Sequence, residues 1–161
     1  MNKEIREKVL GLLRGYPKMV QEIAILRYQL DHMPAVSEDD MIASMNYSHG
    51  ESLTGASNPG VSNKTQSIAL NYQAVMARER EELRKGLRLN LHELEEKKDE
   101  LLRSIELLED RQADILRLYY MERKTWSQIS STIYVSERTA QRIRRSAISE
   151  LCRIYEGLLR P

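Results

Sequence analysis

The residues best suited to chemistry in this sequence are cations gathered near one end of the chain. Residues 123 to 147 contain six cationic side chains and one carboxylate, that of Glu137. This segment therefore has a formal charge of +5, and since the whole chain has +1, the remainder has −4. Such segregation is expected when one surface faces phosphate groups. The six cations are Arg123, Lys124, Arg138, Arg142, Arg144 and Arg145.

The spacing after Ser136 predicts an amphipathic helix. Ser136 is a suitable N-cap, and the carboxylate of Glu137 in the first turn complements the helix dipole. Apolar residues recur every three or four positions and predict the buried face. They are Ala140, Ile143, Ala147 and Leu151.

The opposite face of this helix carries side chains that can read DNA. A helix fits the major groove, where Arg can pair with guanine, Gln with adenine, and a Thr methyl can touch thymine. We assign base reading to Arg138, Thr139, Gln141 and Arg142. We assign phosphate contacts to Arg123, Lys124, Ser136, Arg144 and Arg145. The alternative is a solvated charged face without a nucleic-acid partner.

Two shorter helices are predicted before this one. Apolar residues define the first through Ile115, Leu118 and Tyr119, and the second through Trp126, Ile129 and Ile133. We expect Thr125 to cap the second, Tyr134 and Val135 to make the tight connection, and Val135 to fill the angle between the helices. A positive φ at Tyr134 would be strained. Three helices within about forty residues is the size of a helix-turn-helix unit.

Residues 109–151, about a quarter of the chain, resemble the fourth region of bacterial sigma factors. The matching features are Arg111-Gln112 before Ile115-Leu116, the run Trp126-Ser127-Gln128-Ile129, and the run Val135-Ser136-Glu137-Arg138-Thr139. Tyr134 and Ser130 depart from the Gly and Ala common there. The wider layout is similar to phage and prophage transcriptional regulators of the RinA and ArpU type. The resemblance implies a regulator, or one component of a split sigma factor, because no aromatic promoter-melting segment is visible.

The preceding sequence predicts the helices that support this unit. Two apolar stripes, interrupted at Gly15-Tyr16-Pro17, predict two helices or one kinked helix that ends near Met33-Pro34. The first stripe is Ile5, Val9, Leu12 and Leu13, and the second is Val20, Ile23, Leu26 (or Arg27) and Leu30. Residues 34–62 are polar, and we expect weak order from His49 to Gly60.

Residues 63–108 predict one long amphipathic helix, about 70 Å long at 1.5 Å per residue. It needs a partner, which could be the N-terminal helices, a second copy of the chain, or both. Its apolar stripe is Ile68, Tyr72, Val75, Leu83, Leu87, Leu91, Leu94, Leu101, Ile105 and Leu108, with Glu79 and Lys98 on the stripe.

Other chemistry finds little support in the sequence. His32, His49 and His92 are far apart and lack metal-site spacing, no glycine loop ends in Gly-Lys-Ser/Thr, and no nucleophile has a partnered base. We therefore expect no enzyme activity, cofactor or metal. No apolar run approaches the length of a membrane span, and the start is unlike a signal peptide, which predicts a cytoplasmic protein. Cys152 is expected to be a buried small hydrophobe.

These observations predict an all-α protein: an N-terminal helical pair (1–33), a polar loop (34–62), a coiled-coil-like helix (63–108) and a C-terminal helix-turn-helix unit (109–161). The leading hypothesis is a phage-type transcription regulator whose C-terminal unit binds double-stranded DNA, while the N-terminal helices and the long helix form a homo-oligomer or contact RNA polymerase. The alternatives are the small DNA-recognition subunit of a phage packaging terminase, or a coiled-coil interaction protein without DNA binding.

Overall fold

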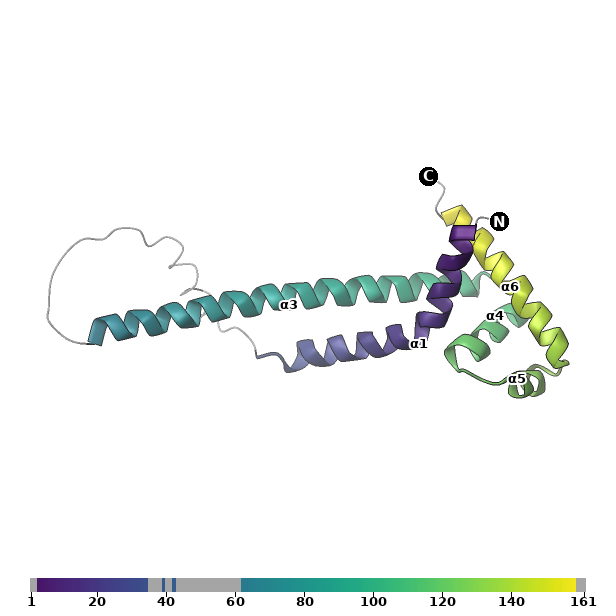
Figure 1. Cartoon of the computed structure of the whole chain (residues 1–161), viewed down its shortest axis with the longest axis horizontal. Coiled ribbons are helices and arrows are strands. Elements are labelled where there is room, and N and C mark those ends of the chain that lie inside the picture. Colours follow the sequence, from purple (N-terminus) through teal and green to yellow (C-terminus); the bar gives the residue numbers. More distant parts are fainter. Residues whose placement is uncertain (1–2, 35–38, 40–41, 43–61, 159–161) are drawn as a thin grey trace. The chain divides into compact units, whose positions relative to one another are not determined.

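The structure, a computed structural model, describes residues 3–34, 39, 42 and 62–158 (Figure 1). Within those residues the secondary structure is helical and contains no strand, so the predicted all-α class is confirmed. The expectation of weak order between His49 and Gly60 lies outside the described residues, as does His49 itself.

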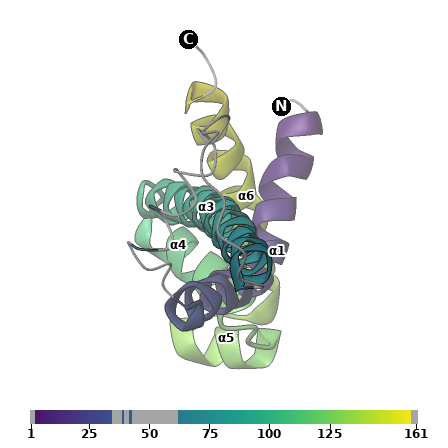
Figure 2. The ribbon, with the colours of Figure 1, turned by 90° about the vertical axis from the view of Figure 1, so that its left-hand side faces the viewer.

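Helix α1 is a single helix, Lys3–His32, with Pro17 inside it. Figures 1 and 2 show α1 changing direction along its length. A proline inside a helix explains such a kink, because it lacks the N–H for one helical hydrogen bond and its ring clashes with the preceding turn. The predicted buried position at Val20 is wrong: Val20 is 40% exposed and Met19 is buried. Two successive steps of three residues lead from Leu13 through half-buried Tyr16 to Met19, so the buried stripe runs one residue before Val20.

Helix α3, Ser62–Glu106, is the predicted long helix. The last part of its predicted stripe is confirmed, since Leu101, Ile105 and the following Leu108 are buried. The early part is wrong, because Tyr72, Val75 and Leu83 are each at least half exposed, whereas Ala74 and Ala77 are buried. The side chain of Ile68 lies outside the described residues. The exposed residues are Tyr72 at 65%, Val75 at 50% and Leu83 at 56%.

The physical reason is that small residues form the inner face of this part of α3. Steps of three and four from Ala74 and Ala77 lead through Glu81, Arg84 and Leu87, which are half-buried, toward Leu101. Arg84 donates a hydrogen bond from a guanidinium nitrogen to the carbonyl oxygen of Met33 at 2.9 Å. A prediction based on large apolar residues does not identify an alanine or an arginine as part of a buried helix face.

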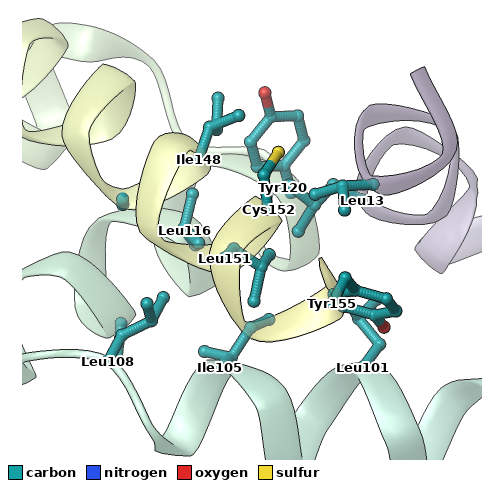
Figure 3. Packing of buried hydrophobic residues seen from close by; sticks show 13 residues of the cluster. Leu13, Leu101, Ile105, Leu108, Leu116, Tyr120, Ile148, Leu151, Cys152 and Tyr155 are labelled. Carbon is teal, nitrogen blue, oxygen red and sulfur yellow. The ribbon is translucent and has the colours of Figure 1, made fainter. Parts of the chain in front are cut away.

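The chain forms two compact units, one made of residues 1–25 with 92–161 and the other of residues 26–91. The first unit holds the main hydrophobic core, in which the first part of α1, the last part of α3 and the C-terminal helix α6 (Glu137–Leu158) meet. Figure 3 shows Leu13 of α1 beside Tyr120 and Cys152. The main core comprises Val9, Leu13, Leu101, Ile105, Leu108, Ala113, Leu116, Tyr120, Ala147, Ile148, Leu151, Cys152 and Tyr155.

A second, smaller core lies in the same unit and fixes the cationic segment. Its buried members are Ile115, Leu118, Ile129 and Ala140, each from a segment after residue 109. Partly buried residues pack around them, namely Tyr119, Trp126, Ile133, Val135 and Ile143. This core joins the helices that the sequence predicts to bind DNA.

Candidate nucleic-acid interface

The first predicted short helix is present. Helix α4, Asp110–Leu116, continues into a π-helical segment, η1, Arg117–Met121. Ile115 and Leu118 are buried as predicted, and Tyr119 is half-buried. The chain then reaches the next helix through residues 122–125, where Arg123 has a φ of 55°.

Helix α5, Trp126–Ile133, begins with the predicted cap at Thr125. The N–H of Gln128 donates to Thr125 Oγ1 at 3.4 Å, and the N–H of Thr125 donates to Gln128 Oε1 at 3.0 Å. This reciprocal pair is a capping box, which satisfies two backbone donors that would otherwise lack partners. Ile129 is fully buried, so one face of α5 is anchored.

The connection from α5 to α6 is as tight as predicted. Tyr134 ends α5 in the left-handed conformation, with φ 55° and ψ 45°, and its side chain is 93% exposed. A non-glycine residue in this conformation costs on the order of 1 kcal/mol or more. Val135 follows and packs against the small core, as expected for the residue between the two helices.

Ser136 caps α6 as predicted. The N–H of Thr139 donates to Ser136 Oγ at 3.2 Å, and the two hydroxyl oxygens lie 2.9 Å apart. The Thr139 hydroxyl, which the sequence assigns to base reading, is therefore engaged within the cap, whereas its methyl group takes no part in that bond. The Ser136 hydroxyl, which the sequence assigns to phosphate, is also engaged within the cap.

One face of α6 is anchored along its length. Ala140, Ala147 and Leu151 are fully buried and Ile143 is half-buried, which confirms the predicted inner face. The helix continues about two turns beyond Leu151. Sequence reasoning missed the burial of Ile148 and Tyr155, although their spacing of three and four residues from Leu151 extends the same stripe.

The opposite face of α6 carries three exposed arginines. Arg138, Arg142 and Arg145 are exposed, and none of them forms an ion pair with another residue that the structure describes. Gln141, beside them, is half-buried. Farther along, Arg153 differs, because its Nη1 lies 3.0 Å from Glu150 Oε2.

Arg144 lies apart from these three arginines. Its guanidinium carbon is 4.8 Å from the centroid of the Tyr119 ring and 5.3 Å from that of Trp126. The two rings are stacked on each other, 4.6 Å between centroids and 27° between planes. The Arg144 Nε is buried and has no hydrogen-bond partner among the described residues. Aromatic contacts thus hold a side chain that the sequence assigns to phosphate.

Arg144 also lines a pocket of about 360 Å³ together with Arg123 and Lys124. Arg14, from α1, lines the same pocket with Tyr119 and Tyr120. Sequence reasoning missed Arg14, because it is more than a hundred residues from the cationic segment and nothing in its local pattern distinguishes it. Lys124 has one carboxylate neighbour, with its Nζ 2.9 Å from Glu122 Oε2.

The histidines and the cysteine that the structure describes do not form a metal site. Across the described ranges, no group of three or more His, Cys, Asp or Glu side chains is placed to hold a metal ion. His32 bonds to the Tyr28 carbonyl, and His92 lies beside Glu96. Cys152 is fully buried, as predicted, and burial raises the pKa of its thiol. Among the described helices none is both long and apolar enough to cross a membrane.

Comparison with known proteins identifies a family. The family described as "Protein of unknown function (DUF722)" matches residues 42–153, which is more than half of the chain. That match includes α4, α5 and most of α6, whereas α1 lies before it. No curated protein and no solved structure matches the chain.

Proposed function

We propose that this protein, which belongs to the DUF722 family, binds double-stranded DNA sequence-specifically through a helix-turn-helix formed by α5 and α6. The biological role we propose is that of a phage-type transcription regulator acting in the cytoplasm. In this proposal α6 enters the major groove and α5 supports it across the backbone.

The observation that carries the proposal is the division of α6 into two faces. The inner face is fixed by fully buried Ala140, Ala147 and Leu151, so α6 is held as a rigid element. The outer face offers Arg138, Arg142 and Arg145, which have no ion pair in the described part of the chain. Arginines held in this way keep their donors available for guanine edges and phosphates.

The start of α6 further supports the proposal. Recognition helices contact bases mainly through their N-terminal residues. Here the first turns carry Arg138, Gln141 and Arg142, and the tight turn at Tyr134 leads directly into them. We therefore keep Arg138, Gln141 and Arg142 as base-reading residues and propose that Thr139 contributes its methyl group.

The decisive experiment compares two arginines of the same helix. A duplex site is first selected from random sequences, and its affinity is then measured by fluorescence anisotropy for the parent, Arg142→Ala and Arg153→Ala. Arg142→Ala should cost about 1–3 kcal/mol and relax the preference at one base pair. Arg153→Ala removes the same charge from a residue already paired with Glu150, so it should change the affinity much less.

Two results would overturn the proposal. One is a parent that shifts no duplex even at low ionic strength, where phosphate contacts are strongest. The other is a parent that binds DNA while Arg142→Ala and Arg153→Ala are indistinguishable from it. Regulation, as distinct from binding, is tested with a reporter downstream of the selected site: unchanged transcription in the presence of the protein would exclude it.

Contact with RNA polymerase and homo-oligomer formation stay predictions. A dimer would provide two reading helices and would match a palindromic site. Sedimentation velocity over a range of protein concentrations tests this, and a sedimentation coefficient that stays at the monomer value throughout would contradict it.

A further inference from the structure

The pocket beside α6 gathers positive charge from three separate segments of the chain. Arg14 comes from α1, Arg123 and Lys124 come from the segment between η1 and α5, and Arg144 comes from α6. Among the residues that the structure describes, the rest of the lining is Tyr119 and Tyr120, and no carboxylate lines the pocket. Four cations and no anion make the pocket strongly positive.

Within the described structure an ion pair compensates one of these four charges. Lys124 is paired with Glu122, its Nζ 2.9 Å from Oε2, whereas Arg14 and Arg123 form no ion pair with any residue that is described. A concave site with like charges and low-dielectric walls focuses the electric field into the pocket. The cations repel one another there, and a bound anion would relieve that repulsion.

Arg144 is fixed in the wall of this pocket. Its guanidinium lies over the Tyr119 and Trp126 rings, so the planar group has little freedom to turn. Its Nε is buried without a hydrogen-bond partner in the described chain, which is costly for a charged donor. A guanidinium presents its donors in a planar fork that suits the oxygen atoms of a phosphate.

Tyr120, which lines the pocket, is affected by two of the cations. Burial raises the pKa of its phenol, and the positive charges of Arg144 and Arg14 oppose that rise. Arg14 and Arg144 are thus close enough to influence one hydroxyl, although they belong to the first and the last helix of the described chain.

We infer that Arg14, Arg123, Lys124 and Arg144 together bind a phosphate group in this pocket. Arg144 lies on the same helix as Arg142 and Arg145 but is held toward η1 and α5, at the side of the exposed arginine face. DNA phosphates flank a helix that occupies the major groove. The backbone of DNA is therefore the first source to test, and this choice of source rests on the function proposed above. A free phosphate compound is the second source.

The experiment uses the full chain and has two arms. In the first arm, the midpoint of thermal unfolding is measured in sodium phosphate and in sodium chloride at equal ionic strength and pH. In the second arm, the affinity for the selected duplex is measured at several salt concentrations. Both arms compare the parent with Arg14→Gln, Arg14→Lys and Arg78→Gln, where Arg78 lies on α3 outside the pocket.

Phosphate should raise the unfolding midpoint of the parent above its value in chloride, because a ligand that binds only the folded state stabilises it. Arg14→Gln should lose that increment, whereas Arg14→Lys should keep part of it and Arg78→Gln all of it. Arg14 is exposed, so the glutamine variant should fold, which circular dichroism checks. If DNA supplies the phosphate, Arg14→Gln should also lower the slope of log affinity against log salt by about one.

The two arms separate the possible failures. If the parent binds no DNA, the function proposed above fails while the phosphate arm still tests the pocket. A phosphate increment that needs Arg14, with an unchanged salt slope, identifies a free phosphate compound as the source. If phosphate gives no increment and Arg14→Gln leaves the salt slope unchanged, the inference is overturned even when Arg142→Ala abolishes specific binding.

Discussion

The guanidinium of Arg144 lies 4.8 Å from the centroid of the Tyr119 ring, and this contact ties α6 to η1. The Trp126 ring stacks on Tyr119, so the first residue of α5 belongs to the same arrangement. One cation and two aromatic rings therefore hold α6, η1 and α5 together.

We predict that Arg144→Lys loosens this arrangement. A lysine keeps the charge but loses the planar stacking surface, so the free energy of unfolding should fall by about 1 kcal/mol. Trp126 is the only tryptophan, so its fluorescence reports on this position directly. Its emission should shift in Arg144→Lys and stay unchanged in Arg145→Lys, the exposed neighbour. Identical spectra and stabilities for parent and Arg144→Lys would contradict the prediction.

The capping box of α5 should contribute measurably to stability. Thr125→Ala removes the hydroxyl that accepts from the Gln128 N–H, and the loss should be about 1 kcal/mol in urea denaturation. Ser131→Ala is the matched control, since Ser131 is exposed within the same helix and bonds only to the carbonyl of Ser127. Alanine favours a helix interior, so the control should be neutral or slightly stabilising. Equal losses in both variants would exclude a special role for the cap.

Tyr134 should be a position where glycine is favoured over alanine. Its φ of 55° strains any residue that has a Cβ atom, and its exposed ring makes little contact that could be lost. Tyr134→Gly relieves the strain, whereas Tyr134→Ala keeps it, so the glycine variant should be more stable than the alanine variant by about 1 kcal/mol. A more stable alanine variant would show that the turn does not hold this conformation in solution.

Leu13 should be essential to the main core although it lies far along the sequence from α6. It is fully buried beside residues of α6 and η1, so Leu13→Ala should cost about 2–5 kcal/mol. Val20→Ala, at a position of α1 that is 40% exposed, should cost less than about 1 kcal/mol. Thermal or urea unfolding measures both. Similar costs at the two positions would mean that α1 does not complete this core.

Stability should decline in alkaline solution. Burial raises the pKa of Cys152 above its ordinary value of 9.0 and the pKa values of Tyr120 and Tyr155 above 10.0. An acid whose pKa is higher in the folded state keeps its proton there, so the unfolded state loses protons first and stability falls as pH rises past the ordinary pKa. Urea unfolding at pH 8 and at several values above 9 measures this decline.

Cys152→Ala separates the thiol from the tyrosines. The variant should be less stable at pH 8, because a buried group is removed, but its stability should fall less steeply just above pH 9. The steeper fall above pH 10, which the tyrosines cause, should remain. An unchanged slope just above pH 9 would show that the thiol titrates normally in the folded protein.

The sequence by itself determined the local structure of this protein. Helix caps at Thr125 and Ser136, the turn at Tyr134 and the buried stripe through Ala140 and Leu151 were all predictable, because each depends on residues within a few positions of one another. The family match adds membership but no role, so DNA binding stays a proposal that the local chemistry supports.

Tertiary structure alone decided which surfaces are buried and which distant residues meet. Ala74 and Ala77 are buried while Tyr72 is exposed, because burial depends on the neighbours that a helix packs against and not only on the hydrophobicity of its residues. Leu13 completes a core formed mostly by residues after 100, and Arg14, one residue later, lines the cationic pocket. These contacts join residues that are more than a hundred positions apart in the sequence, so no local sequence pattern encodes them.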